Sequence, residues 1–268
     1  MRERAPMRAE TIKVLERALE IMRYLAQDPR GYSLSEVSAG LGLAKSTARR
    51  FLVTLVHQGF VEQDPETERY QLGLAILDLS LALQRNSNLV AIAQPVLERL
   101  RDLTGETAGL HVRLGDRQVC LAAVESRERI RYVFDLGQTT PLYAGAESKV
   151  LLAGMTPEER ADFLARVPRV PFSETTLTDA ERLREEVERV ARLGHAISIN
   201  ELGRGAAAVA APVRDRYGRI VAAVSVVGPL SRMTPPRLDE LIPIVKEAAD
   251  EVSRRLGYSM ASLSPKRP

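Results

Sequence analysis

Three histidines and one cysteine are the residues of this sequence best suited to metal binding or nucleophilic catalysis. His57, His111 and His195 stand far apart in the chain, and Cys120 is its single thiol. Compact zinc motifs and local nucleophile motifs place their residues at short spacing, and no Gly-x-Ser-x-Gly sequence supplies a serine nucleophile. We therefore predict no catalytic residue and no metal site, and we interpret Cys120 as a buried, inert thiol.

Two glycine-rich stretches imitate phosphate-binding motifs. Residues 40–46, GLGLAKS, lack the glycine that a P-loop requires before its lysine, since Ala44 stands there, and a predicted helix precedes them instead of a strand. Gly203, Gly205 and Ala208 imitate a dinucleotide fingerprint, but they lead into an extended run without a following helix. We therefore predict no cofactor.

Residues 34–52, LSEVSAGLGLAKSTARRFL, combine a short helix, a glycine turn and a second helix with a basic outer face. This second helix, predicted over 44–57, turns its apolar side chains inward, and no acidic residue lies between Glu36 and Glu62 to repel DNA phosphates. The pattern predicts a recognition helix that enters a major groove about 12 Å wide. Its predicted DNA contacts are Lys45, Ser46, Thr47, Arg49 and Arg50.

The flanking segments predict the rest of a winged helix-turn-helix within residues 1–73. An amphipathic helix starts near Thr11, and Ser33 can cap the short helix that follows. Residues 60–63 and 69–72 alternate like paired strands around Asp64 and Pro65, which predicts a wing. Further DNA contacts are expected from Arg69 on the wing and from Arg2, Arg4 and Arg8 in the N-terminal arm.

The remaining chain predicts a linker helix over 74–88, an α+β domain over 89–258 and a flexible tail over 259–268. The linker carries apolar residues without a packing partner in the small first domain, so we expect it to contribute to a dimer contact. Antiparallel hairpins with segregated helices define the α+β class. The expected elements are helices at 90–104 and 237–256, helices with capping boxes at Thr156/Glu159 and Thr178/Glu181, and strands at 107–114, 118–124, 129–134, 195–199, 206–213 and 220–227.

Composition bounds the function without identifying it. The net charge of +3 is too small to indicate a nucleic-acid binder by itself, and the aromatic content of 4% argues against a surface that binds by ring stacking. The single cysteine excludes an intramolecular disulfide. Neither a signal sequence nor a long apolar run is evident, so we expect a cytoplasmic protein without a membrane partner.

Over nearly its whole length the sequence resembles the IclR (isocitrate lyase regulator) family of bacterial transcription factors. The resemblance implies a winged helix-turn-helix joined by a linker helix to a GAF-like effector domain with an antiparallel sheet. It further implies homodimers or dimers of dimers on palindromic or repeated operators, with repressors commoner than activators. The matching segments are AKST at 44–47, LVHQGFVEQDPETERYQLG at 55–73, PLYAGAESKVLLA at 141–153 and AAPVRDRYGRIVAAVSVVGP at 210–229.

The resemblance also implies an effector pocket between the sheet and the helix that begins near Ala146. A small organic or aromatic acid is the expected effector, because the helix start offers backbone N–H groups. Glu147 departs from the family pattern, which has a small residue there: inward it would repel a carboxylate or pair with a cation, whereas outward, the orientation we expect, it suits a helix N-terminus. The implied effector residues are Ala146, Glu147, Ser198, Ala208, Ser225 and Val227.

Three functions stay open at this point. A ligand-responsive, sequence-specific transcriptional regulator, with repression the expected mode, agrees with the order of helix, turn, helix and wing. An architectural DNA-binding protein without a ligand needs only the basic surface. An enzyme with a DNA-binding appendage has no catalytic motif to support it.

Overall fold

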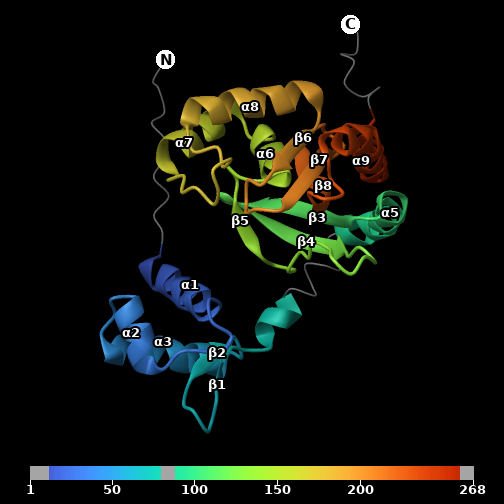
Figure 1. The fold of residues 1–268 in the computed structure, drawn as a ribbon. Helices are drawn as coiled ribbons and strands as arrows, with labels where there is room; N and C mark the ends of the chain where they lie inside the picture. Colours follow the sequence, from blue (N-terminus) through green and yellow to red (C-terminus); the bar gives the residue numbers. More distant parts are fainter. Residues whose placement is uncertain (1–11, 80–87, 260–268) are drawn as a thin grey trace, which may run out of the picture. The chain divides into compact units, whose positions relative to one another are not determined.

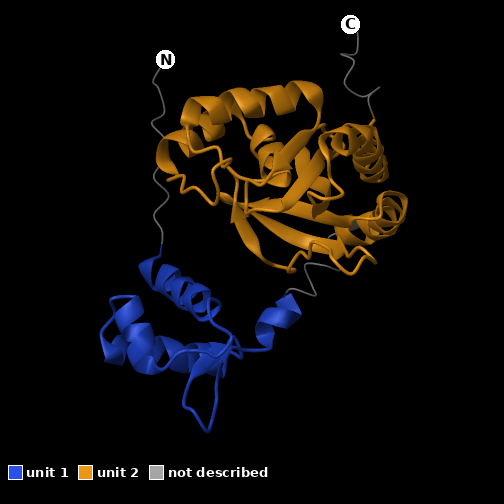
Figure 2. Ribbon diagram, viewed as in Figure 1, with its two compact units in different colours: residues 1–86 blue, residues 87–268 orange. Residues whose placement is uncertain are grey.

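The structure, a computed structural model, describes residues 12–79 and 88–259. The chain divides into two compact units, residues 1–86 and residues 87–268 (Figure 2). The predicted arm contacts Arg2, Arg4 and Arg8, most of the linker helix and nearly all of the predicted tail lie outside the described residues. Within those residues, no helix is long and apolar enough to cross a membrane.

The first unit is the predicted winged helix-turn-helix (Figure 1). Its core is a small apolar cluster to which the first three helices and both strands contribute, with Ile21, Val37 and Leu52 fully buried. The antiparallel pair β1 and β2 forms the wing, in register Val61 with Leu72. The elements are α1 (Lys13–Leu25), α2 (Leu34–Gly40), α3 (Lys45–His57), β1 (Val61–Gln63) and β2 (Tyr70–Leu72).

A reciprocal capping box starts α2, and it confirms the prediction that Ser33 caps this helix. The Ser33 hydroxyl accepts a hydrogen bond of 3.3 Å from the Glu36 N–H, and Glu36 Oε2 accepts one of 2.7 Å from the Ser33 N–H. The Ser33 N–H bond is the largest cause that holds the pKa of Glu36 below its usual range. The cap therefore satisfies backbone donors that the helix cannot satisfy itself.

Removing this cap should destabilise the first unit. We expect Ser33→Ala to lower the free energy of unfolding by about 1 kcal/mol, because the Glu36 N–H loses its acceptor. Ser35→Ala, an exposed position in the same turn, is the matched control and should leave stability nearly unchanged. Urea denaturation followed by circular dichroism measures both variants, and equal midpoints would contradict the role of the cap.

The second unit is an antiparallel sheet with helices on both faces (Figure 1), which confirms the α+β class. The six strands follow the order β5-β4-β3-β8-β7-β6. Helices α5 (Asn88–Thr104) and α9 (Pro235–Arg255) pack on one face, and α6 (Ala146–Ala153), α7 (Pro157–Arg166) and α8 (Ala180–Leu193) form a second core on the other. The strands are β3 (Thr107–Leu114), β4 (Arg117–Val124), β5 (Thr139–Pro141), β6 (Ala196–Ile199), β7 (Ala206–Arg214) and β8 (Ile220–Pro229).

The predicted strand at 129–134 is wrong, because this segment is irregular and its carbonyls bond side chains instead of a strand. The Tyr132 carbonyl accepts a hydrogen bond of 2.6 Å from the Thr107 hydroxyl, and the Ile130 carbonyl accepts one from Arg232. The edge strand lies later in the chain, at β5. Tyr132 and Phe134 pack as partly buried rings against the core of α6 to α8.

Of the two capping boxes predicted in the second unit, one is confirmed, and the other cap is displaced by one residue. Thr156 and Glu159 form the capping box of α7. Helix α8 is capped by Asp179, which accepts a hydrogen bond of 2.8 Å from the Arg182 N–H, and not by Thr178. Asp179 stands closer to the first helical residue, and its carboxylate is a strong N-cap acceptor.

Residues 75–79, which belong to the predicted linker segment, are helical. Leu74, Leu77 and Leu79 are 70%, 52% and 59% exposed, so the first unit does not cover them. Their exposure agrees with the expectation that this segment lacks a packing partner within the DNA-binding domain.

Candidate DNA-binding surface and ligand pocket

The outer face of α3 carries the predicted DNA contacts. Ala48, Leu52 and Leu55 are buried and hold the helix against α1, α2 and the wing. On the opposite side no acidic residue occurs, and none of the five predicted contact side chains on α3 has a hydrogen bond or ion pair with the described residues. The structure places all five on the exposed side of one helix, namely Lys45, Ser46, Thr47, Arg49 and Arg50.

This face has the shape and charge that a major groove requires. The first-turn N–H groups of α3 have no side-chain cap, because its N-cap residue is Ala44. Such free N–H groups, together with Lys45, favour a phosphate at the helix start. Arg49 and Arg50 lie one turn further on, where guanidinium groups can donate paired hydrogen bonds to a guanine edge.

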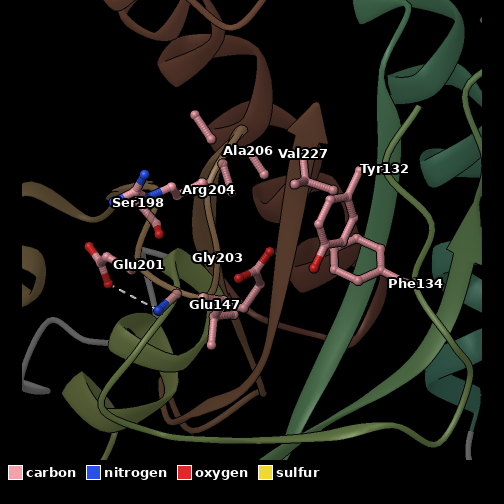
Figure 3. A pocket seen from close by; sticks show the side chains of 13 residues that line it. Tyr132, Phe134, Glu147, Ser198, Glu201, Gly203, Arg204, Ala206 and Val227 are labelled. Carbon is pink, nitrogen blue, oxygen red and sulfur yellow. Dashed lines mark hydrogen bonds between the residues drawn. The ribbon is translucent and has the colours of Figure 1, made fainter. Parts of the chain in front are cut away.

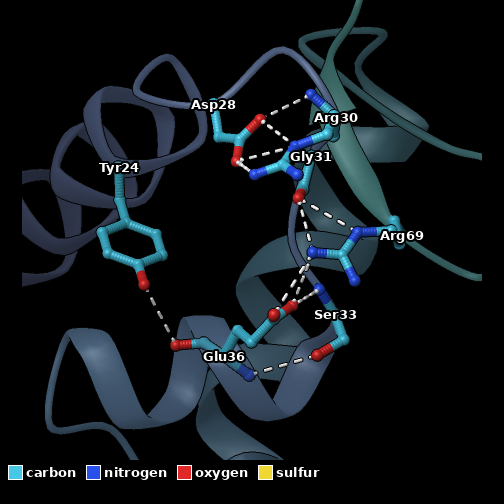
Figure 4. A network of polar contacts seen from close by, with 7 residues as sticks. All are labelled: Tyr24, Asp28, Arg30, Gly31, Ser33, Glu36 and Arg69. Carbon is cyan, nitrogen blue, oxygen red and sulfur yellow. Dashed lines mark hydrogen bonds and ion pairs between the residues drawn. The ribbon is translucent and has the colours of Figure 1, made fainter.

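Arg69 lies differently from the sequence expectation. Its guanidinium donates hydrogen bonds of 3.1 and 2.9 Å to the Gly31 carbonyl and forms an ion pair of 3.0 Å with Glu36 (Figure 4). The side chain thus joins the wing to the segment before α2. Two of its three guanidinium nitrogens thus have partners within this unit, and its role as a DNA contact stays a prediction.

The wing itself is acidic. Asp64 turns the hairpin by accepting hydrogen bonds of 2.9 and 2.8 Å from the N–H groups of Glu66 and Thr67. Glu62, Glu66 and Glu68 are exposed on the same hairpin. The basic surface of the described first unit is therefore concentrated on α3 and not on its wing.

A pocket of about 100 Å³ lies in the second unit, beside the start of α6 (Figure 3). Its wall combines two aromatic rings, small apolar residues of β7 and β8, and a loop that contains Gly203. Four predicted effector residues line it, namely Glu147, Ser198, Ala208 and Val227. The other lining residues are Tyr132, Phe134, Gly145, Glu201, Leu202, Gly203, Arg204, Ala206 and Ala207.

Two predicted effector residues do not line the pocket. Ala146 is fully buried in the core of α6. Ser225 is also fully buried, and its hydroxyl lies 3.2 Å from His111 Nε2. Because Gln118 Oε1, at 2.8 Å from His111 Nδ1, can only accept, a neutral His111 donates to Gln118 and accepts from Ser225. Ser225 is thus a core hydroxyl with its hydrogen bond made.

The expected outward orientation of Glu147 is wrong. Its side chain is 4% exposed and points into the pocket on the side of the Tyr132 ring (Figure 3). Burial is the main cause that raises the pKa of Tyr132 and raises the pKa of Cys120 to about 12, and the Glu147 charge adds to both. Burial lowers the pKa of His111, and the Glu147 charge opposes that shift.

Glu201 and Lys149 form a buried ion pair behind the pocket that the sequence analysis missed. Lys149 Nζ donates hydrogen bonds of 2.6 Å to Glu201 Oε1 and 2.6 Å to the Ile197 carbonyl, and it lies 3.3 Å from Glu186 Oε1. The other oxygen, Glu201 Oε2, accepts a hydrogen bond of 3.0 Å from the Gly145 N–H (Figure 3). A lysine inside the otherwise apolar run KVLLA was the available signal.

Both units match known regulator domains in sequence. Residues 14–65 match the family described as the IclR helix-turn-helix domain, and residues 81–254 match the family described as the bacterial transcriptional regulator IclR C-terminal domain. The chain belongs to the IclR family. Members of this family are DNA-binding transcriptional regulators, and this chain is one of them.

Two relatives align with this chain over most of its length. The transcriptional regulator BhcR of Paracoccus denitrificans is 36% identical over 242 residues, covering 90% of this chain and 86% of BhcR. The transcriptional repressor AllR of Escherichia coli K12 is 31% identical over 252 residues, covering 94% and 93%. Among solved structures, an IclR homologue from Microbacterium hydrocarbonoxydans, complexed with 4-hydroxybenzoate, superposes with a TM-score of 0.76 at 26% identity, covering 91% and 98%.

Proposed function

We propose that this IclR regulator is a cytoplasmic repressor without enzymatic activity, and that a small molecule bound in the pocket beside α6 changes its affinity for operator DNA. Lys45, Ser46, Thr47, Arg49 and Arg50 contact the operator. Glu147, Ser198, Ala208 and Val227 contact the effector.

The exposed basic face of α3 is the observation that carries this proposal. It lies in a compact unit of its own, while the pocket lies in the other unit. A DNA reader and a ligand site in separate units are the arrangement that effector control of transcription requires, since each ligand must bind while the other site remains accessible. The relative AllR is a transcriptional repressor, which supports repression as the mode of action. The solved homologue is complexed with 4-hydroxybenzoate, which supports a small-molecule ligand.

The proposed active form is a homodimer or a dimer of dimers. A single helix-turn-helix reads only a few base pairs, and helix-turn-helix dimers read two half-sites one or more helical turns (about 34 Å each) apart, which needs two copies. The exposed Leu74, Leu77 and Leu79 give such copies an apolar contact. Sedimentation at micromolar concentration measures the assembly.

Selection from a pool of random DNA duplexes tests the DNA-binding part. We expect the bound pool to converge on a sequence with two related half-sites about one helical turn apart, because α3 presents base-reading side chains in each copy. The converged duplex should outcompete random DNA at physiological salt. A pool that binds but never converges would contradict sequence-specific regulation and favour an architectural role.

A further inference from the structure

Glu147 is a buried carboxylate that faces a cavity without a partner. It is 4% exposed, and among the described residues none donates a hydrogen bond to it or forms an ion pair with it. An isolated buried charge is costly, and buried carboxylates are ordinarily paired with a cation or a donor. The missing partner is therefore expected from the molecule that fills the pocket.

We propose that the pocket binds a small primary amine, protonated at neutral pH, whose ammonium group pairs with Glu147. This inference rests on the proposed function, because it identifies the chemical class of the effector for the same pocket. The ligand supplies the charge that the protein lacks at this position.

One backbone donor at the place that would suit an anionic ligand is already used by the chain itself. Glu201 accepts the Gly145 N–H at the start of α6, and Glu201 also pairs with Lys149. A ligand carboxylate bound to the uncapped N–H groups of the first turn of α6 would lie beside Glu201 and would face the unpaired Glu147. Because Glu201 is paired with Lys149, the unpaired charge at this end of the pocket is that of Glu147, and it opposes an acid and favours a cation.

The arginine at the pocket, Arg204, does not compensate the negative charge of Glu147. Arg204 is the single basic residue among those described as lining the pocket. Its side chain is 83% exposed and pairs at 2.8 Å with Glu174, which is 86% exposed. The guanidinium therefore lies in solvent at the rim, where water screens its charge, while Glu147 lies inside.

The remaining wall suits a short apolar body beside the ammonium group. Tyr132 and Phe134 lie edge to face at 5.2 Å, and ring faces attract cations as well as alkyl groups. Ala206, Ala208 and Val227 complete an apolar surface without further charge. A dry cavity of about 150 Å³ holds benzene, so a pocket of about 100 Å³ suits about five heavy atoms.

Isobutylamine, isobutanol and isovalerate test the inference, since they share one branched skeleton and differ in charge. Isothermal titration of the full chain at pH 7.5, without DNA, should show saturable binding of isobutylamine at millimolar concentration. Isobutanol should bind at least about tenfold more weakly, and isovalerate should not bind, because a charge-assisted hydrogen bond is roughly twice as strong as a neutral one.

A matched pair of variants locates the binding group. Glu147→Gln should weaken isobutylamine binding by about tenfold or more. Glu174→Gln, the same change in an exposed residue near the rim, should leave it unchanged, and circular dichroism checks that both variants fold.

Tighter binding of isovalerate, no saturable binding of isobutylamine, or equal affinity of wild type and Glu147→Gln would each overturn the inference. The ligand comparison on the wild-type chain holds even if a variant fails to fold. These titrations contain no DNA, so their outcome does not depend on the duplex selection. If the chain bound isobutylamine but showed no operator specificity, the proposed function would be refuted and the inference about the ligand would stand.

Discussion

Arg49→Ala and Arg50→Ala are each expected to weaken specific operator binding by about tenfold to a hundredfold, since a bidentate contact to a base is worth about 1–3 kcal/mol. Both side chains lie exposed on α3, next to buried Ala48, and neither has a bond within the described protein. Their loss therefore removes no hydrogen bond or ion pair of these side chains with the described residues. The measurement is a competition gel shift that compares the selected duplex with random DNA.

Arg23→Ala is the matched control, because Arg23 is exposed on α1, outside the face that carries the predicted contacts. It should keep the operator affinity of the wild type. The melting temperatures of all three variants should match that of the wild type as well. Unchanged footprints with both Arg49→Ala and Arg50→Ala would remove the assignment of α3 as the recognition helix.

Lys149→Met is expected to destabilise the second unit by about 3–5 kcal/mol, the usual cost of removing one partner from a buried ion pair. Lys149 is 1% exposed and Glu201 is 6% exposed, so Glu201 would remain as an unpaired buried charge. Glu186 would suffer less, because it keeps its ion pair of 2.8 Å with Arg189. Urea denaturation of the full chain measures the loss.

Two further variants separate the buried charge from lost packing. Arg204→Met breaks an ion pair of similar length that lies in solvent, and it should change stability little. Lys149→Met combined with Glu201→Gln removes both charges and should recover part of the loss. A double variant no more stable than Lys149→Met alone would show that the unpaired charge of Glu201 is not the cause.

The elements that sequence predicted well are those with strong local signals. The apolar spacing of α3 and α9, the capping box at Thr156 and the antiparallel hairpin of β3 and β4 each depend on neighbours along the chain. The segment at 129–134 alternates like a strand, yet its carbonyls bond Thr107 and Arg232, which are distant in sequence. Tertiary contacts of this kind have no local signal.

The candidate sites show the same division. The exposed face of α3 follows from helical periodicity, so the exposure of the five predicted contact residues could be predicted from sequence. The direction of Glu147 could not be, because an acidic residue in the first helical turn is equally compatible with solvent and with a cavity. Glu201 lies in a loop far from α6 in sequence, and only the folded chain brings it to Gly145 and Lys149.

The acidic wing has a consequence for how operator affinity arises. Its carboxylates repel the sugar–phosphate backbone, so the hairpin cannot add to the counterions released on binding. Arg69 meanwhile joins this hairpin to the segment before α2 through its hydrogen bonds to the Gly31 carbonyl. Within the described residues of the first unit, we therefore expect the attraction to the duplex to come from α3 and to be opposed by the wing.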